Sequence, residues 1–151
     1  MKKVNILLIL LVGVMINVKA QHKTMEKNSE RSFREYQAIE NALKSYIESA
    51  KTGDASGYAE DWYEHTRVVG SLDGQFYNIT RDETMKFAEQ LGGSTQVESR
   101  IAWIDYQGNA AVVRLESLNW GGVRYTDFFI LSKAEGKWKI SGKVFDAHDR
   151  N

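Results

Sequence analysis

The chain has 151 residues, of which 42% are hydrophobic and 26% charged, and basic and acidic side chains are equal at 20 each. This length and composition predict one globular domain. Cysteine is absent, which excludes a disulfide framework, a thiol nucleophile and a cysteine-based metal site. Three lysines but no acid lie in the first twenty residues, so the remainder is weakly acidic, and we expect no nucleic-acid partner.

Residues 1–20 have the three parts of a secretory signal peptide. Lys2 and Lys3 form the charged start, residues 6–16 are an apolar core, and Val18-Lys19-Ala20 places small residues at the cleavage positions. The apolar run is shorter than the ~20 residues that span a bilayer, which argues against a membrane anchor. We therefore expect an exported protein, periplasmic or secreted, with no membrane contact after cleavage.

The next segment predicts a disordered lead-in followed by helices. Residues 21–33 are polar and show no period. Ser32-Phe33-Arg34-Glu35 matches a capping box, and the stripe that follows it predicts a helix that ends at Gly53. A short second helix carries Tyr58 and Trp62. A second capping box, Thr80-Arg81-Asp82-Glu83, opens a third helix that ends at Gly92-Gly93.

Strands occupy most of the remaining chain. Two short ones are expected at 65–70 and 75–79, and four longer ones at 96–107, 110–118, 123–132 and 137–144, separated by turns that contain glycine or asparagine. In the last strand, Trp138, Ile140 and Val144 alternate with lysines that include Lys143. This order predicts an α+β fold in which a curved antiparallel sheet packs on three N-terminal helices.

The residues at the joints of this pattern resemble the nuclear transport factor 2-like superfamily, which has a cone-shaped, cystatin-like fold. The resemblance covers residues 34–148. It rests on Tyr46 with Gly53-Asp54, on the 58–62 helix followed by His65-Thr66-Arg67-Val68, and on the hairpin Glu135–Ile140. Within the superfamily, the ending Lys143–His148 is most similar to the putative lumazine-binding, SnoaL-like group. Enzymes and non-enzymatic binding modules share this scaffold, so the resemblance implies a fold more than an activity.

Asp127 and Tyr46 are the first candidate site residues. Asp127 lies on a strand with two largely apolar faces, and a buried carboxyl that stays neutral can donate a hydrogen bond to a developing oxyanion. In ketosteroid isomerases, which share the scaffold of the superfamily that the chain resembles, an acid and a tyrosine occupy comparable places. The isomerase base, however, would fall in the stretch 67–70, which contains no carboxylate. The structural alternatives are a salt bridge from Asp127 to Arg114 or Arg124 and a core position for Tyr46.

The remaining candidates would line a pocket between helices and sheet. His65 is a possible acid or base that would work with Asp127 as a catalytic pair, and the alternative is a rim histidine without a role. The aromatic candidates for ligand contact, each of which could instead be a core residue, are Trp62, Trp103, Trp120 and Tyr125. We do not interpret Asp146, His148 and Asp149 as a metal site, and no cofactor is expected.

Three functions follow from these residues. The first is binding of a small apolar or aromatic molecule in the pocket. The second is an isomerase- or dehydratase-like enzyme that uses His65 and Asp127. The third is a dimeric structural or assembly module. For a homodimer the expected contact is the outer sheet face, where charged residues surround Phe128 and Ile130: Arg114, Glu116, Lys137, Lys139 and Lys143.

We predict that the mature protein begins at Gln21, because the charged start, the apolar core and the small residues before it form a complete signal. The intact mass of the protein recovered from the periplasm or the medium tests this. Recovery there of a species that retains Met1 would contradict it.

Overall fold

The computed structural model describes residues 21, 23 and 25–148, so the predicted signal peptide lies outside the described residues. The chain divides into two compact units, residues 1–37 and residues 38–151. Residues 25–42 are helical, so helix is present across much of the predicted lead-in, and the capping box at Ser32 lies within the helix instead of at its start. None of the described helices is long and apolar enough to cross a membrane. The elements described below belong to the second unit.

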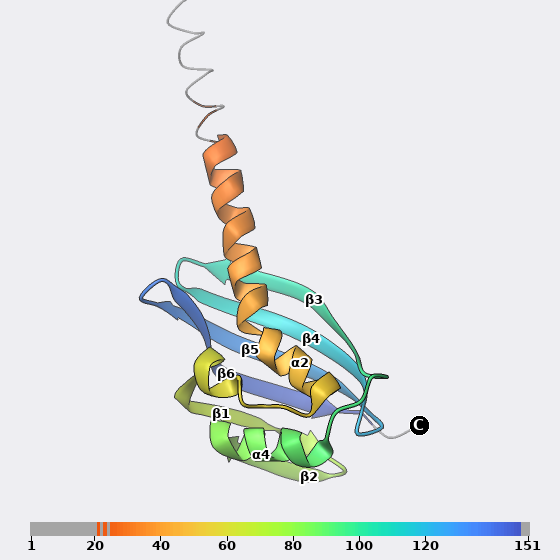
Figure 1. Cartoon of the computed structure of the whole chain (residues 1–151). Coiled ribbons are helices and arrows are strands. Elements are labelled where there is room, and N and C mark those ends of the chain that lie inside the picture. Colours follow the sequence, from red (N-terminus) through yellow and green to blue (C-terminus); the bar gives the residue numbers. More distant parts are fainter. Residues whose placement is uncertain (1–20, 22, 24, 149–151) are drawn as a thin grey trace, which may run out of the picture. The chain divides into compact units, whose positions relative to one another are not determined.

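Three helices lie on one face of a curved sheet (Figure 1). They are α2 (Lys44–Thr52), α3 (Tyr58–Asp61) and α4 (Arg81–Leu91). Gly53 ends α2 in the left-handed conformation with φ 79°, as its place after the apolar stripe predicts. The second predicted helix is a single turn, because the chain is already extended at Trp62.

Six strands form the sheet in the order β2-β1-β6-β5-β4-β3. Their bounds are Trp62–Leu72 (β1), Gln75–Thr80 (β2), Glu98–Gln107 (β3), Ala110–Trp120 (β4), Val123–Ala134 (β5) and Lys137–Ala147 (β6). Neighbouring strands are antiparallel except β1 and β6, which run parallel, so the sheet is mixed. The predicted α+β class with a curved sheet under N-terminal helices is confirmed.

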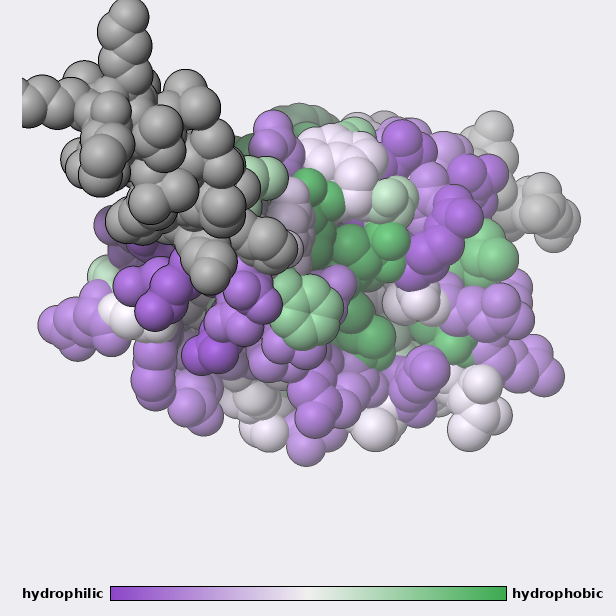
Figure 2. Space-filling view, turned by 90° about the horizontal axis from the view of Figure 1, so that it is seen from above, coloured by the Kyte–Doolittle hydropathy of each residue, from purple (hydrophilic) through white to green (hydrophobic). Residues whose placement is uncertain are grey.

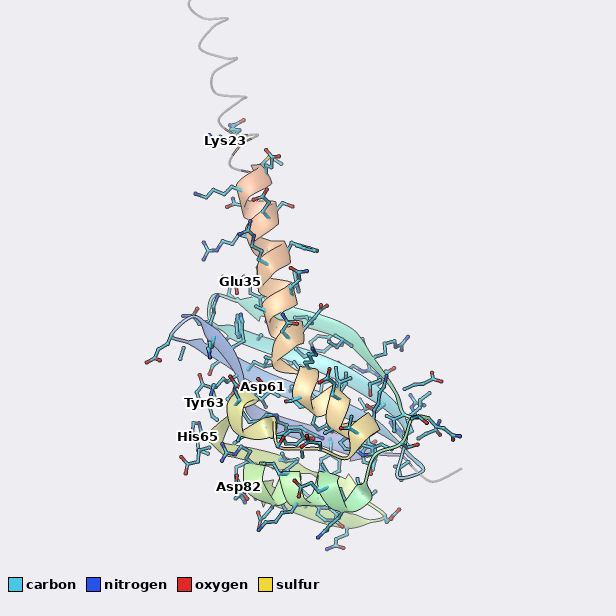
Figure 3. All side chains as sticks on the ribbon, viewed as in Figure 1. Lys23, Glu35, Asp61, Tyr63, His65 and Asp82 are labelled. Carbon is cyan, nitrogen blue, oxygen red and sulfur yellow. The ribbon has the colours of Figure 1, made fainter. Side chains whose placement is uncertain are left out.

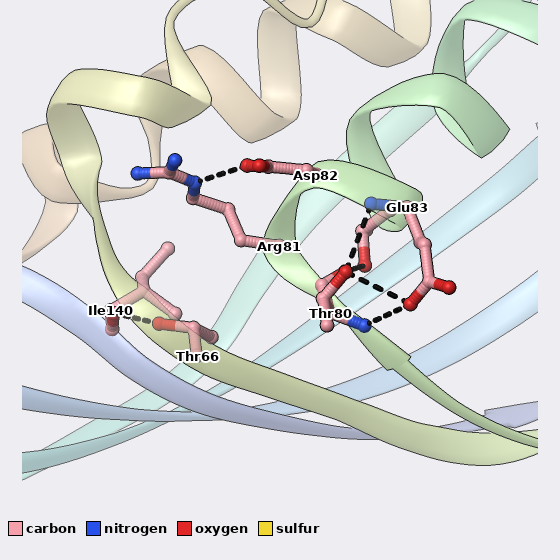
Figure 4. A network of polar contacts seen from close by, with 7 residues as sticks. Thr66, Thr80, Arg81, Asp82, Glu83 and Ile140 are labelled. Carbon is pink, nitrogen blue, oxygen red and sulfur yellow. Dashed lines mark hydrogen bonds and ion pairs between the residues drawn. The ribbon is translucent and has the colours of Figure 1, made fainter.

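The predicted capping box of α4 is formed. The Glu83 backbone N–H donates to the Thr80 hydroxyl at 3.2 Å, and the Thr80 backbone N–H donates to the Glu83 carboxylate at 2.7 Å (Figure 4). These reciprocal bonds satisfy donors that a helix start otherwise leaves unpaired. Figure 4 also shows the Thr66 hydroxyl of β1, which donates to the Ile140 carbonyl of β6 at 2.8 Å.

A β-bulge in β6 reverses the alternation of its side chains. Leu131 of β5 is opposite Ile140, but Ile130 is opposite Gly142, so Ser141 is an extra residue. Trp138 and Ile140 are buried as predicted. Beyond the bulge the prediction is wrong, because Lys143 faces the core and Val144 is 49% exposed.

Gly70 is required by the close approach of β1 and β6. It lies opposite Phe145 in the parallel pair. A Cβ on Gly70 would lie 2.2 Å from the Phe145 carbonyl oxygen, which no side chain tolerates without movement of the backbone. The absence of a side chain therefore lets β6 enter the sheet beside β1.

The sheet face away from the helices exposes apolar side chains. Trp103, Phe128 and Val144 lie on one line across β3, β5 and β6, with Arg114 of β4 between the first two. Val112 and Ile130 form a second pair beside them, and all five apolar residues are exposed. We call these five residues the outer apolar patch. Figure 2 shows a different side, seen from above, where hydrophobic residues gather in the middle with hydrophilic ones around them.

Candidate functional site

A buried polar cluster joins α2 to two central strands. The Tyr46 hydroxyl of α2 donates a hydrogen bond to Asp127 Oδ2 of β5 at 2.8 Å. Lys143 Nζ of β6 forms an ion pair with Asp127 Oδ1 at 2.9 Å and also donates to the Tyr46 hydroxyl. The three side chains thus form a closed triangle of polar contacts, which connects residues from both ends of the domain.

Water is almost excluded from this triangle. The exposed fraction is 0% for Asp127, 2% for Tyr46 and 6% for Lys143. Burial lowers the pKa of Lys143, and the nearby Asp127 carboxylate opposes that effect by favouring the ammonium. Burial, and then the charge of Asp127, raise the pKa of Tyr46 well above its usual range. Tyr46 therefore stays a neutral hydroxyl, whereas Lys143 loses its proton more readily than a lysine in water.

Aromatic rings surround the lysine. The Lys143 ammonium lies 4.4 Å from the ring centroid of Tyr46, 5.2 Å from that of Phe145 and 5.6 Å from that of Phe129. The electron-rich faces of aromatic rings attract a cation. These contacts replace part of the hydration that the ammonium loses on burial.

An apolar chamber of about 40 Å³ lies beside the triangle, between α4 and the sheet. Lys143 and Tyr46 are part of its wall, and the other walls are almost entirely apolar. The chamber residues are Tyr46, Tyr77, Ile79, Thr84, Phe87, Ala88, Leu91, Trp120, Tyr125, Lys143 and Phe145. The indole N–H of Trp120 is buried and finds no acceptor among the described residues. The indole N–H of the core residue Trp62 is in the same state, and a water or a ligand is one kind of partner that satisfies such a donor.

Four of the predicted site residues come together here. Tyr46, Trp120 and Tyr125 line the chamber. Asp127 does not line the chamber. It bonds to the side chains of Tyr46 and Lys143, two residues that do line it. The face shared by Tyr125, Asp127 and Phe129 in the sequence pattern is the buried face of β5.

The other predicted residues lie elsewhere. His65 is exposed on β1, where its ring stacks on Tyr63 with centroids 5.5 Å apart (Figure 3), and no contact joins it to Asp127. Trp62 is a core residue stacked on Tyr58 at 4.9 Å. Trp103 is 42% exposed in the outer apolar patch, because β3 has a bulge between Ile101 and Trp103.

Lys143 is the residue of the candidate site that the strand pattern missed. The alternation of residues 137–144 places Lys143 on the outer face. The structural alternative for Asp127 was accordingly a salt bridge to Arg114 or Arg124. That expectation is wrong, since Arg114 instead pairs with Glu116 at 2.7 Å and Lys143 holds Asp127. The available signal was Gly142, because a glycine inside a strand pattern often marks a bulge.

Comparison with known proteins agrees with this geometry. The family model described as "Putative lumazine-binding" matches residues 34–146. The chain belongs to this family. An NTF2-like protein from Shewanella baltica OS155 is 28% identical, with a TM-score of 0.73 over 78% of this chain and 96% of that one. An NTF2-like protein from Methylobacillus flagellatus KT, also 28% identical, has a TM-score of 0.70 over 77% and 94% of the two chains. Nuclear transport factor 2-like membership, and with it the SnoaL-like fold, is therefore shown.

One relative carries the name of an enzyme. Aldolase FrzH from Cladobotryum sp. is 26% identical over 117 residues, which are 77% of this chain and 94% of that protein. Membership of the family is consistent with the binding of a small molecule, and this distant relative hints at a catalytic member. Among the residues that the structure describes, no group of three or more His, Asp or Glu side chains forms a metal site.

The buried pair makes a prediction about stability. Asp127→Asn leaves the Lys143 cation buried without a counter-charge, and we expect a loss on the order of 3–5 kcal/mol in the free energy of unfolding. The double variant Asp127→Asn/Lys143→Met, which has no buried charge, should recover most of this loss. Urea unfolding near neutral pH measures both. Glu48→Gln, which breaks the exposed pair with Lys44 at 3.6 Å, is the control and should cost less than about 1 kcal/mol.

The deficit of Asp127→Asn should shrink as the pH rises. Lys143 has a lowered pKa in the folded protein and an ordinary one of about 10.4 when unfolded. Between the two values the unfolded chain binds more protons, so stability increases with pH. Without Asp127 the folded pKa falls further, and the gain is larger in the variant. An Asp127→Asn variant as stable as Glu48→Gln at every pH would contradict the prediction.

Proposed function

We propose that this protein binds a small apolar or aromatic molecule in the chamber between α4 and the sheet. The observation that carries the proposal is an apolar chamber that lies directly beside the buried polar triangle. Lys143 and Tyr46 belong to both the triangle and the chamber wall, and the indole N–H of Trp120, another wall residue, has no described acceptor. Apolar walls with a few convergent polar groups are typical of small-molecule sites.

The chamber is small in this conformation. Its volume of about 40 Å³ holds a group of the size of one or two water molecules, whereas ligand pockets usually measure roughly 300–1,000 Å³. Thr84, Phe87, Ala88 and Leu91 of α4 form one wall, so a shift of this helix would enlarge the chamber without breaking the sheet. We infer a ligand whose polar end contacts Lys143 and whose apolar body lies against α4.

An enzymatic function is the second candidate. The name of the FrzH relative favours it, and so does the combination of an acid, an amine and a hydroxyl at one buried point. The acid/base set would be Asp127 and Lys143, in place of His65 and Asp127. Burial gives such groups pKa values suited to proton transfer.

The wider setting of the site is part of the proposal. The signal-like residues 1–20 support an exported protein that works in the periplasm or outside the cell. The outer apolar patch supports a homodimer, because contiguous exposed apolar residues often mark an interface. A dimeric assembly module with a filled chamber is the remaining alternative, and the small volume favours it over a large ligand pocket.

Ligand binding is tested by filling the chamber. Native mass spectrometry of the protein purified from its own host should show a retained small molecule, and Ala88→Leu should abolish it because the larger side chain occupies the chamber. The control is Ala59→Leu, the same substitution at an exposed position of α3. Equal ligand content in both variants, with circular dichroism that shows both are folded, would contradict a site at this chamber.

Assembly is tested by a charge in the outer apolar patch. Sedimentation at micromolar concentration should show a dimer, and Ile130→Glu should give a monomer because a buried unpaired carboxylate opposes association. Ile130 is 50% exposed, so the folded monomer should tolerate the change. Phe76→Glu, at an exposed apolar residue of β2, is the control and should remain a dimer. A wild-type monomer would refute the proposal.

A further inference from the structure

Lys143 differs from every other described lysine in being buried. It reaches the chamber wall from β6, its ammonium pairs with Asp127 at 2.9 Å, and aromatic rings surround it. A lysine removed from water in an apolar pocket is a known kind of amine nucleophile. The placement of this amine at the chamber, beside an acid and a hydroxyl, calls for a more specific role than holding the fold.

We propose that Lys143 forms a covalent imine with small uncharged aldehydes or ketones that enter the chamber. The proposal rests on the proposed binding function, and it identifies the ligand class as carbonyl compounds. Three features of the site fit that class. The walls are apolar and suit a short hydrocarbon chain, Lys143 is one of the residues that line the cavity, and Asp127 lies within hydrogen-bond distance of its amine to exchange protons.

The first step is attack by the neutral amine. Lys143 passes a proton to Asp127, and burial assists this transfer because it turns two charged groups into two neutral ones. The amine nitrogen then bonds to the carbonyl carbon, and the carbonyl oxygen becomes the hydroxyl of a carbinolamine by taking the proton that the nitrogen gives up. Tyr46, which stays protonated, can donate a hydrogen bond to that oxygen as charge develops on it.

The second step releases water. The protonated Asp127 gives its proton to the carbinolamine hydroxyl, the C–O bond breaks, and a protonated imine remains on Lys143. Overall, one carbonyl compound and the lysine ammonium give one iminium ion and one water molecule, so atoms and charge balance. The iminium replaces the ammonium as the cation opposite Asp127. The buried ion pair therefore persists through the reaction, and no additional charge has to be buried.

The size of the chamber limits the compounds that can react. About 40 Å³ admits the end of a short chain, and a longer chain would require the shift of α4 described above. Carboxylates and phosphates are disfavoured, since the described wall offers them no second cation beside Lys143. Propanal is thus a suitable probe, because it is short, uncharged and apolar apart from its carbonyl group.

The test is reductive trapping with propanal and cyanoborohydride, followed by peptide mass mapping. Lys143 should gain the mass of one propyl group, and exposed Lys137 provides an internal reference in the same sample. A lowered pKa leaves about tenfold more free amine for each pH unit by which it is lower. For equal access of the reagent, Lys143 should accordingly be labelled more than Lys137 at a pH near neutrality.

Each result has a definite meaning. Labelling of Lys143 that Ala88→Leu suppresses, with Lys137 unaffected, supports the imine at the chamber. An unmodified Lys143 in folded wild-type protein overturns it, since the ion pair with Asp127 would then be purely structural. If native mass spectrometry still shows a retained ligand in that case, only the imine is refuted and the binding function stands. Absence of both refutes both.

Discussion

The buried ion pair between Lys143 and Asp127 is the constraint on which the rest of the domain depends. Isolated charges are too costly to bury, so each side chain requires the other, and both require the Tyr46 hydroxyl. This requirement fixes α2 over β5 and β6 and determines which face of β6 is inward. The surrounding aromatic rings then exclude water, which strengthens the pair and leaves a small apolar space beside it. The stability of the domain and the position of the chamber thus have a common origin.

Much of the fold could be predicted from the sequence, because local rules agree with tertiary packing over most of the chain. The 110–118 and 123–132 strands alternate, and one predicted face of each is the buried one: Ala111, Val113 and Leu115 in the first, and Val123, Tyr125, Asp127, Phe129 and Leu131 in the second. The capping box at Thr80 and the left-handed Gly53 are determined by neighbouring residues alone. Where local sequence preferences and tertiary packing agree in this way, the ends of helices and strands can be predicted from the sequence. The parallel pairing of β1 with β6 could not be predicted in this way, since it joins segments far apart in sequence.

The residues of the site were harder to predict, because β-bulges such as the one at Ser141-Gly142 change which face a side chain is on. One extra residue in β6 exchanges the two faces of everything that follows, so period-two reasoning places Lys143 on the wrong side. A second bulge in β3 likewise puts Trp103 outside. Asp127 and Tyr46 were recognisable because each lies in a regular stretch of its own element. The alternation of β5 places Asp127 on the buried face, and the apolar stripe of α2 does the same for Tyr46. The partner of Asp127, Lys143, was not recognisable. A buried lysine is rare, and the lysines of the last strand alternate as they would on an exposed face.

The position of β6 also has a consequence for how the molecule folds. The strand made last lies in the middle of the sheet and joins the β1–β2 hairpin to the other three strands. Tyr46 and Lys143 are 97 residues apart in the chain, so their contact closes a long loop. Without β6 the strands form two separate pieces, the β1–β2 hairpin and the three-stranded β3–β4–β5 sheet, and each piece has unpaired edges. The sheet therefore becomes continuous only when β6 is in place, and a chain that lacks this strand also lacks Lys143 and Phe145 of the chamber wall.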